Sequence, residues 1–436
     1  MFVVGVLVIF VGVLVSIALH EVGHLVPAKR FGVKVTKYMV GFGKTLWSTQ
    51  RGETEYGVKA IPLGGYVRLV GMYPPARPRP DGSTRTGFFA TMAEDARAVT
   101  AQEVGPGEEG RTFYSLSVPK KLVVMLGGPV MNLVIAVVLI TVVLVGFGTW
   151  SLTSTLSYVA PCVVAADEGD RECTPADPVA PGAAAGLQAG DQVLSWGGTA
   201  VEDWADISAA IRAGGTGPTD VVVLRDGAEV TLVVTPAVAE RPVVRDGQVV
   251  TDADGVAVTE PVPYVGVGPA TERVRQPITA VPGAVGNIVQ QTGAVVLTLP
   301  QRVLEAGQAA VGARERTGDV VGLVGIGRVA GEIASLEATS YSLLDRFADL
   351  LLLLAALNVA LFVFNLIPLP PLDGGHVAGA LWEGLRRQVA RLRHRPDPGP
   401  VDVARALPLA YAVVIVMIAM TLVITYADIV SPVSTG

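Results

Sequence analysis

Long runs of apolar residues with few charges dominate the hydrophobic pattern of this chain. Four such runs cover residues 1–26, 122–149, 347–367 and 407–426, and we assign residues 347–376, which include the LDGG motif, to the third span. Each is close to or longer than the ~20 residues that a helix needs to cross a hydrocarbon core of ~30 Å. Only 17% of the 436 residues are charged, against roughly 25% in soluble globular proteins. We therefore predict a polytopic α-helical membrane protein with four transmembrane helices.

The first run has an alternative interpretation as a cleaved secretory signal. A signal peptide has a basic start and a small-residue cleavage site. Here no Lys or Arg precedes the apolar stretch, and its end carries His20, Glu21 and His24. We therefore expect this run to remain in the protein as its first membrane span.

The region between the first two runs, residues 27–121, combines two patterns. In residues 55–71, apolar and polar positions alternate around Gly64 and Gly65. This alternation predicts a membrane-associated β-hairpin or β-loop. Residues 73–110 are rich in Pro, Gly, Arg, Glu and Ser and have little hydrophobic periodicity, which predicts a flexible loop.

The regions after the second run differ in character. Residues 150–273 hold short β-rich runs and, within a core of about 175–240, one helical stretch, which predicts a compact α+β module of PDZ size. Residues 274–346 repeat apolar positions with helical spacing, so we expect helices near the membrane there. We interpret residues 377–406 as a basic loop and residues 407–436 as the last span with a short tail.

Clusters of Lys and Arg predict the orientation in the membrane. They lie in residues 29–37, 120–121 and 386–395, and four spans place all three clusters on one side. Such an excess marks the cytoplasmic side, so we expect the termini and the PDZ-sized module to be extracytoplasmic. The net charge is −6 and every Lys precedes residue 122, which disfavours nucleic-acid binding.

Cys162 and Cys173 are the only cysteines, and both lie in the predicted outer segment. An oxidising compartment permits a disulfide bond that closes a short loop between them. Two free thiols are the alternative, and the sequence does not decide between the two.

The motif HEVGH near the end of the first run carries the first candidate chemistry. His20 and His24 are four residues apart, so their imidazoles project from one helix face about 6 Å apart, which suits one Zn²⁺. Zinc lowers the pKa of a bound water towards 7, and Glu21 is placed to take the proton of that water. A solvated helix with unrelated charges is the alternative. It is disfavoured because such residues are costly in an apolar span unless they are paired or face a polar cavity.

The third run ends in NLIPLPPLDGGH, residues 365–376, where three prolines break the helix just before Asp373. Non-helical backbone at membrane depth is tolerated only where it is buried in protein or lines a water-filled cavity. We therefore expect Asp373 to point towards the two histidines and to complete a His₂Asp zinc site. A solvated turn at the membrane interface is the alternative.

Amide groups in the spans are candidates for substrate binding. Asn132 in the second span and Asn365 beside the broken helix are able either to bind a substrate or to hold helices together, and Asn365 is the better candidate. A substrate helix must unwind before its peptide bonds become accessible. The β-loop with Gly64, Gly65 and Tyr66 is suited to receive the unwound segment as an added strand.

Three motifs together resemble the site-2 protease family of intramembrane metalloproteases. They are HExxH at residues 20–24, GPxxN at 128–132 and NxxPxPxLDG at 365–374. The order of elements is similar to that of the bacterial regulator-of-sigma-E protease branch, and PGAAAGLQAGDQVLSWGG at 181–198 resembles part of a PDZ domain. The composition is rich in Ala, Val, Gly and Arg and poor in Lys, as is typical of GC-rich bacteria such as actinobacteria.

The resemblance implies that His20, His24 and Asp373 bind zinc, that Glu21 is the catalytic acid/base, and that the β-loop engages substrate. It also implies that the substrates are single-span membrane proteins, such as anti-sigma factors and remnant signal peptides, which an upstream site-1 protease cuts first. A non-catalytic membrane scaffold that captures peptides with its PDZ module is the alternative function. A metal-ion transporter is disfavoured, because the sequence offers a single site without inverted repeats.

Overall fold

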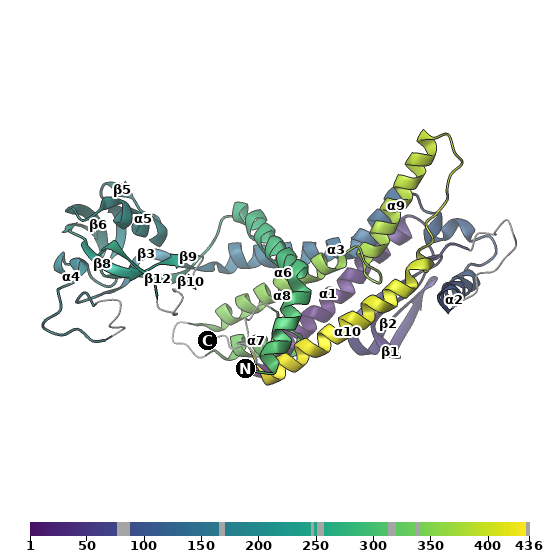
Figure 1. Ribbon diagram of the computed structural model, residues 1–436, viewed down its shortest axis with the longest axis horizontal. Helices are drawn as coiled ribbons and strands as arrows, with labels where there is room; N and C mark the ends of the chain where they lie inside the picture. The colour runs from purple at the N-terminus through teal and green to yellow at the C-terminus, as the bar shows by residue number, and fades with distance from the viewer. Residues whose placement is uncertain are drawn as a thin grey trace. The chain divides into compact units, whose positions relative to one another are not determined.

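The computed structural model describes residues 1–75, 88–164, 171–245, 248–250, 257–312, 320–336 and 341–432 (Figure 1). The chain divides into two compact units. The helical unit comprises residues 1–147 and 277–436, and the β-rich unit comprises residues 148–276.

Among the described residues of the helical unit, four helices are long and apolar enough to cross a membrane. They are α1 (Phe2–Arg30), α3 (Val118–Thr141) with its π-helical continuation η3 (Val142–Phe147), α8 (Leu343–Asn365) and α10 (Leu407–Val430). These helices and the separate β-rich unit confirm the predicted fold class. Within the segment 347–376 assigned to the third span, α8 ends at Asn365, close to the end of the apolar run at residue 367, because the prolines that follow lack the N–H needed to continue a helix.

The membrane helices pack through small residues. α1 contacts α3 and α8, and α3 also contacts α8. At the crossing of α1 and α3, a Cβ on Gly23 would lie 2.2 Å from the carbonyl oxygen of Gly127, and one on Gly127 would lie 2.0 Å from that of Gly23. The two backbones therefore touch, as small residues allow in membrane helices. This contact brings the middle of α3 against the histidine-bearing end of α1.

Two further helices confirm the helical character predicted for residues 274–346. α6 (Val281–Ala310) contacts α8 and α10, and α7 (Leu323–Ser335) contacts α1, α8 and α10. The carboxylate Oδ2 of Asp428, near the end of α10, accepts hydrogen bonds from the backbone N–H groups of Gly322 and Gly325 at the start of α7. Because Phe2 of α1 packs on Gly331 of α7, the start of α1 and the end of α10 lie at the same end of the helical unit (Figure 1).

A β-hairpin lies between α1 and α3, but its bounds differ from the prediction. β1 (Val35–Arg51) and β2 (Thr54–Leu69) pair antiparallel, and Gly52 in the turn between them has φ 62°. Glycine adopts such positive φ values at little cost. Gly64 and Gly65, around which we predicted the hairpin, lie inside β2.

The hairpin folds back on itself. Residues 37–40 of β1 have a strand partner on each side. Val40, for example, pairs with Val58 on one side and with Gly65 on the other. Within the described residues no other strand joins this sheet. The segment 65–69 of β2 therefore has β1 on one side and an edge without a strand partner on the other.

Two segments predicted as loops are helical. α2 (Phe88–Gln102) lies in the predicted flexible loop 73–110, of which residues 76–87 are outside the described residues. The α2 sequence contains several Ala, the strongest helix former, and has neither Gly nor Pro. α9 (Asp373–Leu392) occupies about half of the predicted basic loop 377–406. Charge alone indicated a loop, although the apolar residues between the arginines have helical spacing.

The short helical turns of the helical unit connect these elements. They are η1 (Glu109–Arg111), η2 (Phe113–Ser115), η5 (Ile278–Ala280) and η6 (Val403–Ala406). Beside η6, Asp402 accepts hydrogen bonds from Arg97 of α2, so the segment before α10 is attached to the helix in the first connecting region.

The β-rich unit is built on a six-stranded sheet in the order β12-β3-β4-β6-β7, with β5 paired to β4. Its strands are β3 (Thr149–Val159), β4 (Gln192–Trp196), β5 (Thr199–Ala200), β6 (Thr219–Arg225), β7 (Ala228–Val234) and β12 (Val267–Val274). Two pairs lie outside this sheet, β8 (Ala237–Pro242) with β11 (Thr259–Tyr264) and β9 (Val244–Arg245) with β10 (Gln248–Val249). The sheet thus takes β3 and β12 from outside the predicted core at 175–240.

Alternating apolar residues of the strands close the core of this unit. α4 (Pro181–Ala184) and α5 (Trp204–Gly214) complete it, and Ile207 of α5 packs with Val221 and Val223 of β6, all three fully buried. The carboxylate of Asp203 caps α5 by accepting hydrogen bonds from the first backbone N–H groups of the helix. This arrangement is compatible with a PDZ domain.

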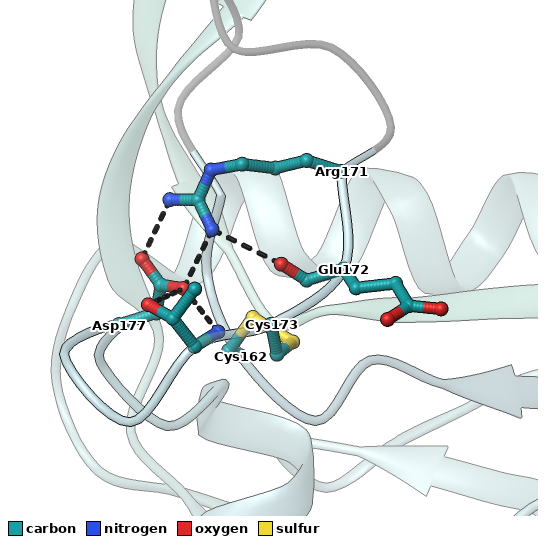
Figure 2. The surroundings of a disulfide bond; sticks show 6 residues. Cys162, Arg171, Glu172, Cys173 and Asp177 are labelled. Carbon is teal, nitrogen blue, oxygen red and sulfur yellow. Dashed lines mark hydrogen bonds and ion pairs between the residues drawn. A yellow bond between two sulfur atoms is a disulfide. The ribbon is translucent and has the colours of Figure 1, made fainter.

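The structure joins Cys162 and Cys173 in a disulfide bond beside an ion pair (Figure 2). The guanidinium of Arg171 donates hydrogen bonds of 2.7 Å to both carboxylate oxygens of Asp177. Asp177 Oδ2 also accepts hydrogen bonds from the backbone N–H and the hydroxyl of Thr174. These bonds to Arg171 and Thr174 hold the pKa of the Asp177 carboxyl well below its usual value.

Candidate active site

The helix α1 places the two histidines of HEVGH on one face. His20 and His24 are one turn apart, and their Nε2 atoms lie 3.2 Å from each other. The Nδ1 atom of His24 donates a hydrogen bond of 2.8 Å to the carbonyl oxygen of Val124 in α3. Since a carbonyl only accepts, Nδ1 carries the proton and Nε2 of His24 presents its lone pair.

The second span supplies a partner for His20. The side-chain nitrogen of Asn132 lies 3.0 Å from His20 Nδ1, while the amide oxygen of Asn132 is buried without a hydrogen-bond partner. Amide oxygen and nitrogen are interchangeable in such an assignment. With the oxygen turned towards His20, it accepts from Nδ1–H, which leaves Nε2 of His20 with its lone pair as well.

The broken segment after α8 brings Asp373 to the histidines. Asp373 is the first residue of α9, where the partial positive charge of a helix start favours a carboxylate. Its Oδ2 atom lies 3.3 Å from Nε2 of His20 and 3.3 Å from Nε2 of His24. A Cβ on the next residue, Gly374, would lie 2.2 Å from the carbonyl oxygen of Ile367, so this tight turn requires a glycine there.

The three atoms that converge have the chemistry of a cation site. His20, His24 and Asp373 are the one group of potential metal ligands found among the described residues. Ligands placed tetrahedrally at zinc distances are roughly 3.3–3.4 Å apart, which matches the 3.2 and 3.3 Å separations. Asp373 Oδ2 is buried without a hydrogen bond, and a Cβ on Gly128 would lie 2.2 Å from His24 Nε2. These residues therefore fit a zinc ion.

Glu21 lies between the histidines and β2. Its carboxylate is within electrostatic reach of His20, His24 and Asp373, and it is hydrogen-bonded to the backbone of Val67 in β2. Glu21 is 9% exposed. A Cβ on Gly65 would lie 2.9 Å from Glu21 Cγ and 3.3 Å from Oε1, so the free edge of β2 runs directly past this carboxylate.

The remaining predicted site residues are dispersed around this cluster. Gly65 touches Glu21, whereas the ring of Tyr66 is stacked on Phe42 with centroids 6.3 Å apart. Gly64 faces the same Phe42 ring and has φ 126°. Asn365 is the last residue of α8 and is half-buried. None of these residues except Gly65 is brought into contact with the histidines, Glu21 or Asp373 by the interactions described above.

Sequence reasoning missed several groups that touch the cluster or attach the neighbouring strands to α1. Gly128 lies against both histidines and the Val67 backbone binds Glu21. The hydroxyl of Tyr38 donates a hydrogen bond of 2.7 Å to the carbonyl oxygen of Ala18, which attaches β1 to α1. Gly128 is part of the GPxxN motif, so its role was within reach of the sequence. Backbone contacts such as that of Val67 leave no signal in residue types.

Comparisons with known proteins identify relatives over nearly the whole length of the chain. The chain is 33% identical to the zinc metalloprotease Rip1 of Mycolicibacterium smegmatis, with 100% of this chain and 99% of that protein covered. It is 32% identical to Rip1 of Mycobacterium tuberculosis strain H37Rv, with 99% of each chain covered. Metalloprotease MmpA of Caulobacter vibrioides is 27% identical over 89% of each chain. The two Rip1 proteins come from actinobacteria, in line with the composition.

The comparison with family models gives the same result for most of the chain. The model of Peptidase family M50 matches residues 8–396. This range contains the HEVGH segment, the GPxxN segment and Asp373. The chain therefore belongs to peptidase family M50, the site-2 protease family of membrane metalloproteases that its three motifs predicted.

Proposed function

We propose that this chain is an intramembrane zinc metalloprotease in which His20, His24 and Asp373 hold the zinc ion and Glu21 is the general base. The observation that carries the proposal is the convergence of two imidazole Nε2 atoms and one carboxylate oxygen within 3.3 Å of each other. Ionisable groups between apolar helices are costly unless they are paired or face a polar cavity. A bound cation would be the partner of all three side chains, the two imidazoles and the carboxylate.

Each residue of the cluster has a chemical task in this proposal. Zinc, when bound, supplies a Lewis acid that lowers the pKa of a water towards 7. Glu21 takes a proton from the water that attacks the peptide carbonyl and returns it to the leaving amine. Asn132 and the carbonyl of Val124 fix the rings of His20 and His24 by binding their Nδ1 atoms. This orienting task for Asn132 replaces the substrate contact suggested by its sequence position.

The substrate binds along the free edge of β2. An unwound segment that pairs with residues 65–69 as an added strand runs past Glu21, because Gly65 and Val67 contact that carboxylate. Gly65 leaves room for the backbone of the substrate at this point. Tyr66 and Gly64 shape the neighbouring part of the edge, and Asn365 binds the substrate where α8 ends.

The substrates we propose are single-span membrane proteins, such as anti-sigma factors and remnant signal peptides, after an upstream site-1 protease has removed their outer part. The basic residues of α9 and of the segments near residues 30 and 120 favour a cytoplasmic location for that end of the helical unit in a bacterial cytoplasmic membrane. The termini and the β-rich unit are then extracytoplasmic. There the PDZ-like module selects or restrains substrates.

The test compares the wild type with Glu21→Gln, purified in detergent with a model single-span substrate. We expect the wild type to cut, a chelator to stop it, and Glu21→Gln to retain zinc while cleavage falls at least about 100-fold. Glu109→Gln is the matched control, since it makes the same change at an exposed residue of the first connecting region and should cut normally.

The alternative function is a non-catalytic scaffold whose PDZ-like module captures outer peptides. It predicts that neither the wild type nor Glu21→Gln cuts the substrate and that chelation changes nothing. Equal behaviour of the two proteins with full zinc content would reject the role of Glu21. Asn365→Ala separates binding from chemistry, because we expect it to raise KM while kcat and zinc content stay near those of the wild type.

A further inference from the structure

A pocket of about 730 Å³ lies on the helical unit, outside the candidate active site. Its walls come from α9, from the segment that leads into α10 and from residues 74–75 and 114–115. In Figure 1, α9 extends beyond the neighbouring helices at the end of the unit away from both termini. Nothing in the proposed proteolytic chemistry uses this pocket.

The pocket has a positive lining. Arg386, Arg387 and Arg405 line it, and Asp402 is its one lining acid among the described residues. The carboxylate of Asp402 is already paired, because its Oδ2 atom lies 2.6 Å from Nη2 of Arg97 and 3.0 Å from Nε of Arg405. The pocket therefore keeps an excess of positive charge.

Arg386 is the cation best placed for a ligand. Within the part of the chain that the structure describes, its guanidinium makes no ion pair and donates one hydrogen bond of 3.1 Å, to the carbonyl oxygen of Pro398. By contrast, the guanidinium of its neighbour Arg387 forms ion pairs with the carboxylates of Glu383, at 3.0 Å, and of Asp397, at 3.5 Å. The fork of an arginine suits two oxygens of a phosphate group.

The exposed face of α9 indicates where such a phosphate comes from. One face of α9 carries exposed apolar side chains, although α9 is not one of the four membrane spans. These side chains are Leu381, Leu385, Val389 and Leu392. Trp382 is 54% exposed beside them and also lines the pocket. A helix with an apolar face, a basic face and an interfacial Trp lies in the headgroup layer of a membrane.

We propose that α9 lies in the membrane interface and that this pocket binds the phosphate headgroup of an anionic phospholipid through Arg386, with Arg405 as a second cation. Basic pockets beside membrane helices on the cytoplasmic side recognise such headgroups. The acyl chains then cover the apolar face of α9, and Trp382 lies between headgroup and chains. Because α9 begins with Asp373, an occupied pocket also steadies the helix that carries this residue.

Lipid retention tests the site without reference to proteolysis. The full chain is placed in nanodiscs of phosphatidylcholine alone or mixed with phosphatidylglycerol, extracted, and examined by native mass spectrometry. We expect the wild type to retain one phosphatidylglycerol in preference to phosphatidylcholine. Arg386→Gln should weaken this retention about tenfold, Arg405→Gln should weaken it less, and Arg386→Lys should keep the preference.

Arg393→Gln is the matched control, because it removes the same charge near the end of the same helix but outside the pocket. It should retain the lipid as the wild type does. An equal loss in Arg393→Gln would mean diffuse attraction to the membrane and would overturn the pocket assignment. Absence of any preference in the wild type would overturn it too. Displacement of the lipid by millimolar inorganic phosphate, with equal binding of phosphate in phosphatidylcholine nanodiscs, would reject a lipid as the occupant.

Discussion

The ammonium group of Lys121, near the start of α3, lies 2.9 and 2.8 Å from the two carboxylate oxygens of Glu383 in α9, and both side chains are buried. Glu383 also accepts a hydrogen bond of 3.0 Å from the backbone N–H of Val401. This ion pair joins the helix that begins with Asp373 to the helix that lies against His20 and His24. It therefore holds the helix that carries Asp373 against the helix that packs on the two histidines.

Replacing Lys121 with Met should destabilise the helical unit. It leaves Glu383 buried with Arg387 as its remaining cation, and breaking a buried pair on one side costs about 3 kcal/mol or more. The double variant Lys121→Met/Glu383→Leu should recover most of this loss, since no charge remains unpaired. Thermal unfolding in detergent measures both, together with zinc content. A double variant no more stable than the single one would contradict this account.

Asn132→Ala should weaken zinc binding while the protein remains folded. The side chain of Asn132 contacts Nδ1 of His20, and loss of such an orienting partner costs roughly 10–100-fold in metal affinity. Competition with a chromogenic chelator measures the change. Asn358→Ala is the control, because Asn358 donates to the hydroxyl of Ser16 rather than to a histidine. If both variants lose the same zinc affinity, the contact of Asn132 is not specific.

Gly65→Ala should reduce cleavage without loss of zinc. The added Cβ would lie 2.9 Å from Cγ of Glu21, so the carboxylate must move, and a displacement of about 1 Å costs on the order of 100-fold in rate. Single-turnover cleavage and zinc content are the two measurements. Gly110→Ala adds the same methyl group where no atom lies within 4 Å and should cut normally. Unchanged cleavage by Gly65→Ala would show that the position of β2 does not affect the carboxylate that we propose as the general base.

The stability of the β-rich unit should fall in acid through Asp191. Burial would raise the pKa of Asp191, but hydrogen bonds from Arg225 and from the backbone of Gln188 outweigh this effect and lower it. A carboxyl with a lowered folded pKa contributes stability above its unfolded pKa of about 3.9, and this is lost as the pH falls through the folded value. The unit should therefore open more easily below about pH 4.

Hydrogen exchange at residues 219–225, corrected for the intrinsic rate at each pH, measures this effect in the full chain. Asp191→Asn should destabilise the unit by about 2 kcal/mol at neutral pH and make its opening less dependent on acid. Asp220→Asn changes an exposed carboxyl of the same sheet and should behave as the wild type. If the opening of Asp191→Asn increased in acid as much as that of the wild type, a group other than Asp191 would be responsible for the pH dependence.

Local patterns were sufficient to predict the membrane helices and most of the residues that we propose as zinc ligands. An apolar run of about 20 residues has few alternatives to a spanning helix. His20 and His24 share a face because any helix places residues four apart together. The prolines after Asn365 end α8 wherever that helix lies, because they cannot donate the next hydrogen bonds.

Other features depended on neighbours far along the chain. The predicted loops at 73–110 and 377–406 contain helices, and the hairpin turn is at Gly52 rather than at Gly64 and Gly65. Composition and alternation describe a segment without its partners. They do not indicate that β1 pairs with both halves of β2, or that α9 is attached to α3 by a buried ion pair.

The sequence by itself determined which residues are able to bind a metal and which segments cross the membrane, because helix periodicity and chain-breaking residues act over a few positions. Only the tertiary structure decided that Asp373 meets His20 and His24 with Oδ2 at 3.3 Å, and that the edge of β2 runs past Glu21. These distances result from the contact of Gly23 with Gly127 and the turn before α9. They are set by packing between segments that are far apart in the sequence, and no local pattern specifies such packing.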